Sequence, residues 1–132
     1  MKVLLLGGGG RETALAWRLA QSARLTQLWV SHENPGFPED ARRLPEGEVS
    51  AVAAEVGIDL VVVGPEAPLA DGVVDACRAR GILAFGPTKA AAMLESSKRF
   101  AKDFMARHGI ATASYQCFRD RESALSAISG PC

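Results

Sequence analysis

Cysteine is scarce in this chain, and the few that occur form no pattern. There are three, Cys77, Cys117 and Cys132, an odd number without C-x-x-C spacing. A disulfide framework needs paired cysteines, and a structural zinc site usually needs closely spaced ones. Both are disfavoured, no metal site is predicted, and a reducing, cytoplasmic compartment fits best.

Net charge and long apolar runs are absent as well. Fifteen basic and fifteen acidic side chains cancel, so the overall balance indicates neither nucleic acid nor a membrane surface as a partner. No run of about eighteen apolar residues occurs, as a membrane span would need. The first residues also lack the basic and then apolar stretch of a signal peptide. We therefore expect neither export nor a membrane span.

The most informative segment that is present is a run of four glycines, at residues 7–10. The apolar residues 3–6 before it predict a strand, and residues 11–20 after it predict a helix. Glycines let a backbone approach an anion closely, and the first amides of a helix carry unpaired N–H donors and the positive end of its dipole. The segment therefore predicts a phosphate-binding turn, although the glycines could also simply tighten the chain.

This turn lacks what two common phosphate-binding motifs require. The dinucleotide fingerprint G-x-G-x-x-G needs a small third residue where the chain has Glu12 or Thr13, and the P-loop needs a lysine that does not follow here. Arg11 and Glu12 stand there instead. An arginine can make a two-pronged contact with phosphate, and a glutamate can accept from a hydroxyl or an amine. The pair indicates a sugar phosphate rather than a pyrophosphate.

Strand and helix patterns alternate after the turn. Further strands are predicted at residues 25–31, 58–63 and 82–85, and helices at residues 49–56 and about 69–80. The segment between the second strand and the next helix, residues 32–47, is rich in proline and glycine and predicts a long loop. The alternation predicts an α/β fold, a Rossmann-like parallel sheet with helices on both faces.

Ligands of such sheets bind beyond the carboxyl ends of the strands. Residues 64–66 and 86–88 form glycine-bearing turns that would gather there with the first turn. The final third has a different pattern, which predicts helices at residues 88–94 and 97–108, a strand at 113–118 and a helix at 121–128. Because the pattern stops before a strand on which the last helix could pack, it suggests a fragment.

The chain resembles the N-terminal part of the phosphoribosylamine–glycine ligases, ATP-grasp enzymes of purine synthesis. The resemblance rests on G-G-R-E at residues 9–12, A-L-A-W at 14–17, V-G-P-E-A-P-L at 63–69, F-G-P-T at 85–88, and S-K with F-A-K within 97–102. Each motif is weak alone, but their order and spacing are specific. The resemblance implies a pre-ATP-grasp, sugar-phosphate-binding domain at residues 1–100 and the truncated beginning of an ATP-grasp domain at residues 101–132.

The resemblance also implies a reaction. ATP phosphorylates the glycine carboxylate, and the amine of 5-phosphoribosylamine attacks the acyl phosphate, giving glycinamide ribonucleotide, ADP and phosphate, with Mg²⁺ or Mn²⁺ neutralising phosphate charge. Lys102 would reach the nucleotide phosphates, although a solvated lysine is an equal alternative. The residues that would face or line the sugar-phosphate crevice are Gly7, Gly9, Gly10, Arg11, Glu12, Pro65 and Glu66.

The resemblance further implies that the active site is incomplete within residues 1–132. The family's glycine-rich nucleotide loop and acidic metal ligands would lie beyond Cys132, so no catalytic residue is expected in this segment. The remaining body is expected in the same polypeptide or in a partner chain. We expect the segment alone to form no product and to retain no cofactor tightly.

Two departures from the family pattern keep alternatives open. Thr13 stands where the family usually has histidine, and the family's P-G-N-x-G loop is assigned to Pro35-Gly36-Phe37-Pro38, without its asparagine or second glycine. A non-catalytic remnant is therefore one alternative. Another is an NAD-dependent or nucleotide-sensing Rossmann module, because Glu33 follows the second strand, where an acidic residue would contact a ribose.

Overall fold

The computed structural model describes residues 1–128, which divide into two compact units between Ser96 and Ser97. The sequence places a domain boundary near residue 100. That the second unit begins an ATP-grasp domain stays a prediction. Each unit is described by itself.

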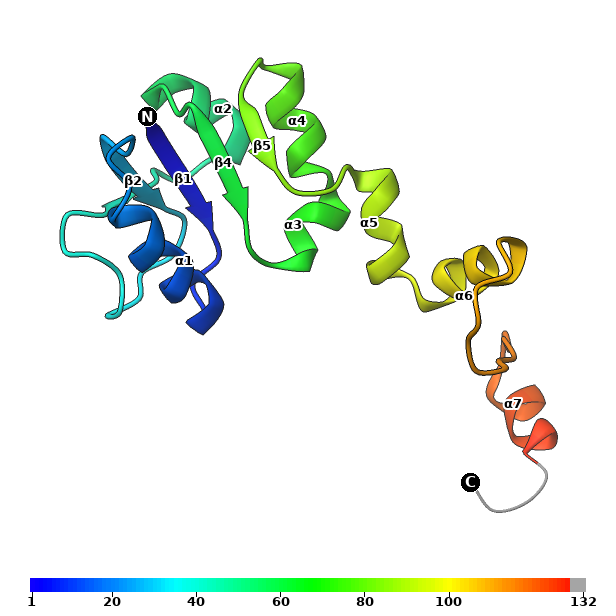
Figure 1. Cartoon of the computed structure of the whole chain (residues 1–132). Coiled ribbons are helices and arrows are strands. Elements are labelled where there is room, and N and C mark those ends of the chain that lie inside the picture. Colours follow the sequence, from blue (N-terminus) through cyan, green and yellow to red (C-terminus); the bar gives the residue numbers. More distant parts are fainter. Residues whose placement is uncertain (129–132) are drawn as a thin grey trace. The chain divides into compact units, whose positions relative to one another are not determined.

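The first unit is built on a five-stranded parallel sheet with the order β3-β2-β1-β4-β5 (Figure 1). Its strands are β1 (Lys2–Leu6), β2 (Gln27–Val30), β3 (Arg42–Arg43), β4 (Leu60–Val63) and β5 (Leu83–Phe85). Parallel strands end at the same edge, so the turns after β1, β4 and β5 lie together there, as the sequence predicts. The predicted α/β, Rossmann-like sheet is confirmed.

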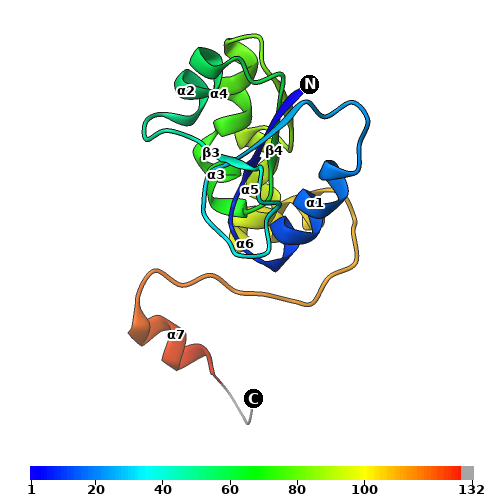
Figure 2. The same cartoon turned by 90° about the vertical axis from the view of Figure 1, so that its left-hand side faces the viewer.

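Helices cover both faces of this sheet, which is also confirmed. Helix α1 (Gly10–Ala20) lies on one face, and α2 (Val49–Val56), α3 (Glu66–Asp71) and α4 (Val73–Ala79) lie on the other (Figure 2). Helix α5 (Lys89–Ser96) packs on α3 and α4. Successive side chains of a strand point to opposite faces. Alternate residues of β1 and β4 therefore build two cores, with Leu4, Leu6, Val61 and Val63 toward α2 and α4, and Val3, Leu5 and Val62 toward α1.

Two local predictions within this unit are corrected. The single helix predicted at residues 69–80 is two helices, because Gly72 has φ +97° and ends α3 before α4 begins. That left-handed conformation is open to glycine and strained for other residues. The loop predicted at residues 32–47 contains the short strand β3, whose two residues pair with Trp29 and Val30. A strand of two residues leaves no alternation from which to predict it.

The second unit contains α6 (Lys98–Arg107) and α7 (Arg121–Ala127) among its described residues. Side chains cap both helices: Ser97 Oγ accepts the Phe100 amide at 3.3 Å, and Asp120 accepts the Ser123 amide at 2.7 Å. The predicted strand at residues 113–118 is wrong. Strand-forming residues are stable as a strand only when a neighbouring strand pairs with their backbone, and residues 97–128 supply none.

None of the helices that the structure describes is both long enough and apolar enough to cross a membrane.

Candidate functional site

The glycine run forms the predicted turn between β1 and α1. Gly7 has φ +105°, and its amide donates to Ser31 Oγ at the end of β2 at 2.9 Å. A β-carbon at Gly7 would lie 2.9 Å from the side chains of both Glu12 and Pro65. Conformation and space therefore both require glycine here. The turn after β4 is in direct contact with the turn after β1, as the sequence predicts.

The side chain of Glu12 holds these two turns together. It is buried, with 5% of the side chain exposed, and its carboxylate accepts the Gly9 amide at 2.7 Å and Arg11 Nε at 2.9 Å. It also lies across Gly64, where a β-carbon would be 2.7 Å from Glu12 Cδ. The hydrogen bond from Arg11, followed by that from the Gly9 amide, lowers the pKa of Glu12 against the opposing effect of burial.

The structure thus places Glu12 beneath the turn rather than at its mouth. Its two hydrogen bonds leave about two of the four acceptor sites of the carboxylate free, but only 5% of the side chain is exposed to a ligand. The contact seen here is structural, and it fixes the direction of Arg11. A direct contact between Glu12 and the substrate stays a prediction.

Arg11 lies at the mouth of the site and connects both turns. Its Nε donates to Glu12, and its Nη1 lies 3.6 Å from Glu66 Oε1. The hydrogen bond to Glu12 raises the pKa of the guanidinium. Because the side chain is 56% exposed and a guanidinium has five N–H donors, Arg11 keeps donors for a ligand. The structure therefore brings together Gly7, Gly9, Gly10, Arg11, Glu12, Pro65 and Glu66.

Backbone amides add to this donor set. The N–H groups of Gly8, Gly10 and Arg11 have no acceptor among residues 1–128, whereas the Gly9 amide donates to the Glu12 carboxylate. Such amides at a helix N-terminus, together with an arginine, favour an anion with several oxygens. The arrangement suits a phosphate group better than a single carboxylate.

Residues 31–36, which we call the brace segment, support the turn from the side of β2. Asn34 Nδ2 donates to the Gly8 carbonyl at 2.8 Å, and Asn34 Oδ1 accepts the Gly36 amide at 2.8 Å. A β-carbon at Gly8 would lie 2.7 Å from His32 Cβ. The sequence predicts only a loop here. Proline and glycine in the segment indicate a turn but not which backbone group a side chain reaches.

The brace segment also contains an asparagine and a glycine close to the loop assigned to P-G-N-x-G. An N-x-G spacing is present as Asn34-Pro35-Gly36, three residues before the register assigned from Pro35. Asn34 and Gly36 each have a contact that suits the residue present. Asn34 donates to the Gly8 carbonyl, and a β-carbon at Gly36 would lie 2.7 Å from Thr13 Cγ2. Thr13 itself donates to the Gly9 carbonyl at 3.1 Å. That Phe37 stands at the position of the loop asparagine stays a prediction.

A hollow of about 550 Å³ adjoins the brace segment, and its polar lining is Glu33, Asn34, Glu39 and Arg43. Glu33 is the residue on which the NAD alternative depends. Its carboxylate pairs with Arg43 Nη1 at 2.9 Å. The ion pair engages the Oε1 atom of an exposed carboxylate.

In the second unit, Lys102 lies in a basic pocket of about 410 Å³, lined by Lys98, Arg99, Lys102, Tyr115, Gln116 and Cys117. Its Nζ donates to Thr112 Oγ1 at 2.7 Å and to the Ala113 carbonyl at 2.8 Å, and it lies 5.8 Å from the centre of the Tyr115 ring. An ammonium group has three donors, so one is left for a ligand. A role of Lys102 with nucleotide phosphates stays a prediction.

Residues 1–128 contain no group of three or more His, Cys, Asp or Glu side chains that could hold a metal ion.

Comparison with known proteins places these features in a family. Residues 1–95 match the family described as phosphoribosylglycinamide synthetase, N domain. A phosphoribosylamine–glycine ligase of Ralstonia nicotianae is 53% identical over 133 residues, covering 97% of this chain and 32% of that protein. One of Pseudomonas putida is 51% identical over 134 residues, with 97% and 31% covered. The chain spans about a third of the length of these relatives.

Solved structures show the same fold at low identity. N5-carboxyaminoimidazole ribonucleotide synthetase from Thermotoga maritima matches with a TM-score of 0.68 and 18% identity, over 98% of this chain and 37% of that one. The biotin carboxylase domain of a thermophilic 2-oxoglutarate carboxylase matches with a TM-score of 0.67 and 19% identity, over 96% and 32%. These likenesses concern the fold alone.

Proposed function

The chain belongs to the phosphoribosylglycinamide synthetase N-domain family, and from this premise we propose that it binds the phosphorylated ribose of 5-phosphoribosylamine within a phosphoribosylamine–glycine ligase. In the complete enzyme, ATP would activate the glycine carboxylate and the amine of the sugar phosphate would attack it. The residues of this chain would hold the sugar phosphate in place for that attack.

One observation carries the proposal: Arg11 is held between Glu12 and Glu66 beside unpaired helix-terminal amides. A fixed guanidinium can make two parallel hydrogen bonds to phosphate oxygens. The free amides of Gly8, Gly10 and Arg11 then supply further donors. Asn34 and Glu12 position the donors for this contact, because Asn34 holds the backbone of the turn and Glu12 holds the arginine.

We further propose that Lys102 contributes its remaining donor to the nucleotide phosphates. ATP and its Mg²⁺ or Mn²⁺ supply the phosphoryl group and neutralise its charge when bound. Since residues 1–128 bring together no metal-ligating group of three or more, the metal ligands are assigned to the part of the ligase outside this chain. A cytoplasmic location belongs to the same proposal.

Calorimetric titration of the chain tests the proposed function. Ribose 5-phosphate is expected to bind, while ribose without phosphate and NAD are expected not to bind. Binding of NAD alone would favour the Rossmann cofactor module. If neither ribose 5-phosphate nor NAD binds, the result would favour a non-catalytic remnant. Equal binding of ribose and ribose 5-phosphate would contradict the role of the glycine turn.

A further inference from the structure

One face of the first unit leaves a set of apolar side chains uncovered. Strands β4 and β5 pair with Leu60 opposite Leu83 and Val62 opposite Phe85. Val62 is buried in the core beneath α1, whereas Leu60, Leu83 and Phe85, which we call the open sheet face, lie on the same side of the sheet and are not fully buried. Leu83 is 63% exposed and Phe85 is 71% exposed. Helix α1 therefore leaves the outer half of this face open.

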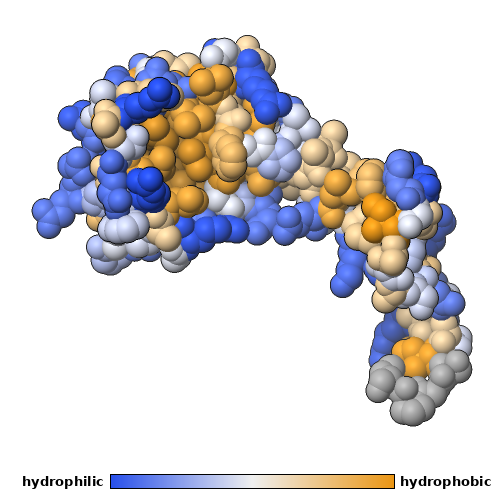
Figure 3. All heavy atoms as spheres, in the orientation of Figure 1, coloured by the Kyte–Doolittle hydropathy of each residue, from blue (hydrophilic) through white to orange (hydrophobic). Residues whose placement is uncertain are grey.

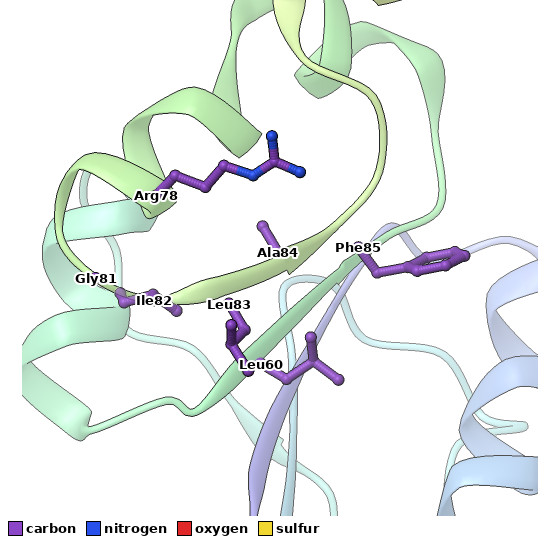
Figure 4. Close-up of a pocket in the computed structure, with 7 residues that line it drawn as sticks. All are labelled: Leu60, Arg78, Gly81, Ile82, Leu83, Ala84 and Phe85. Carbon is purple, nitrogen blue, oxygen red and sulfur yellow. The ribbon is translucent and has the colours of Figure 1, made fainter.

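The figures show the same arrangement. Apolar atoms gather over the strands on the side that faces the viewer in Figure 3. Leu60, Leu83 and Phe85 lie on the side of the β4–β5 ribbon away from Arg78 (Figure 4). The open edge of β5 is hollowed by about 480 Å³, lined in part by these three residues. An apolar side chain of an occupant would fit in this hollow.

Wholly parallel sheets normally have both faces covered, since helical crossovers lie on each side. Here the opposite face of β4 and β5 is covered by α3 and α4, and α5 packs on those same helices. Within residues 1–96, then, no element covers the open sheet face. Strands β4 and β5 therefore carry apolar residues typical of buried strands on a face that no helix of this unit covers.

We propose that the open sheet face is covered by an apolar segment of the polypeptide that follows this region in the ligase family. The inference rests on the proposed function, in which this chain is one portion of a longer ligase. It is supported by the relatives, of which this chain spans about a third, so that about two thirds of their length is left to supply the cover.

The size of the face favours a covalently linked occupant over a second copy of this chain. The open sheet face consists of three side chains, and even a large aromatic side chain buries only about 150–250 Å². A stable interface between separate proteins buries about 800 Å² on each partner. A segment in the same polypeptide has a high effective concentration and needs no such area. The observations therefore favour an intramolecular contact.

Hydroxyl-radical footprinting tests the inference directly. The isolated chain is compared with a chimera in which residues 1–132 are followed by the remaining two thirds of the Ralstonia nicotianae ligase. Leu83 and Phe85 are expected to lose most of their labelling in the chimera. Unchanged labelling would overturn the inference. Labelling that already falls in the isolated chain as its concentration rises, with dimers in sedimentation, would also overturn it in favour of a second copy.

Substitutions at two exposed aromatic residues, Phe85 on the open sheet face and Trp17 on α1, give a matched control within the same chimera. Phe85→Lys is expected to restore the labelling of Leu83, because a charged side chain disfavours an apolar cover. Trp17→Lys, at a residue that is 65% exposed, is expected to leave Leu83 protected. Equal effects would contradict the inference.

Circular dichroism confirms that each variant is folded. Footprinting does not depend on ligand binding, so the two proposals can fail separately. If Leu83 and Phe85 are protected in the chimera but ribose 5-phosphate does not bind, the result would contradict the proposed function alone. Binding without that protection would contradict the docking proposal alone.

Discussion

The carboxylate of Glu12 lies across the bare α-carbon of Gly64, and this contact ties the turn after β1 to the turn after β4. Strand pairing holds the start of both turns, through the Gly64 amide that donates to the Leu6 carbonyl at 3.1 Å. Glu12 adds a side-chain contact further along, and it simultaneously holds the Gly9 amide and the Arg11 guanidinium. The position of the ligand-facing arginine therefore depends on a glycine in the other turn.

Gly64→Ala tests this contact. A β-carbon there would lie within 2.7 Å of Glu12 Cδ, so the buried carboxylate has to move, and unfolding in urea is expected to show a loss of about 1–3 kcal/mol. Gly10→Ala is the matched control, because a β-carbon at Gly10 meets nothing within 4 Å and α1 begins at this residue. Its effect is expected to stay within about 1 kcal/mol in either direction. Similar losses for both variants would contradict the account.

Glu12→Gln is expected to change how stability depends on pH. Folding lowers the pKa of Glu12 below its ordinary value of 4.5, so the ionised group stabilises the fold above that value, and this contribution is lost as pH falls through the lowered pKa. The variant should be less stable at pH 7 by about 1–3 kcal/mol, and the difference should shrink on acidification below pH 4.5. Urea unfolding at several pH values measures it.

The exposed Glu39 offers a control for that experiment. Glu39→Gln should follow the pH dependence of the unsubstituted chain. A constant difference between the Glu12 variant and the unsubstituted chain across the acid range would mean that the charge of Glu12 does not stabilise the turn.

Asn34→Ala tests the brace segment. Removing the amide side chain takes away the bonds to the Gly8 carbonyl and the Gly36 amide, with an expected loss of about 1–2 kcal/mol in unfolding free energy. Ribose 5-phosphate should also bind more weakly, because the turn is no longer held. Gln21→Ala, at the end of α1, should change neither quantity. Unchanged binding in the Asn34 variant would show that the brace is not needed.

Arg11→Lys separates a two-pronged phosphate contact from a simple positive charge. The variant keeps the charge but loses the planar pair of donors, so affinity for ribose 5-phosphate is expected to fall by about tenfold or more. Arg18→Lys, on the exposed surface of the same helix, should bind like the unsubstituted chain. Calorimetry measures both, and equal affinities for all three chains would remove Arg11 from the site.

Assayed with ATP, magnesium, glycine and phosphoribosylamine, the 132-residue chain is expected to form no glycinamide ribonucleotide. The proposal assigns it substrate binding, and it assigns the metal ligands to the part of the ligase outside this chain. Chromatographic detection of product measures this, and product above the enzyme-free control would contradict the assignment.

The sequence predicts the sheet and its first turn well because these depend on local patterns. Val61 to Val63 form an apolar run that is typical of a buried parallel strand, and the glycine run between the first strand and the first helix indicates a turn. The strand predicted at residues 113–118 fails for the opposite reason, since a strand depends on a partner that is not part of its own pattern.

The support of the site could not be predicted in the same way. That Glu12 turns inward, and that Asn34 reaches Gly8, are consequences of side-chain packing between segments far apart in the sequence. Residue type indicates only that a carboxylate or an amide is available. Which acceptor or donor it meets is decided by the fold.

Amide chemical shifts on titration with ribose 5-phosphate test the central claim most directly. Our account predicts large shifts for the free amides of Gly8, Gly10 and Arg11, and a smaller one for Gly9, whose amide stays with Glu12. Ribose without phosphate should shift none of them. If ribose 5-phosphate leaves these amides unmoved, or shifts only residues around Lys98 and Lys102, the glycine turn is not the sugar-phosphate site.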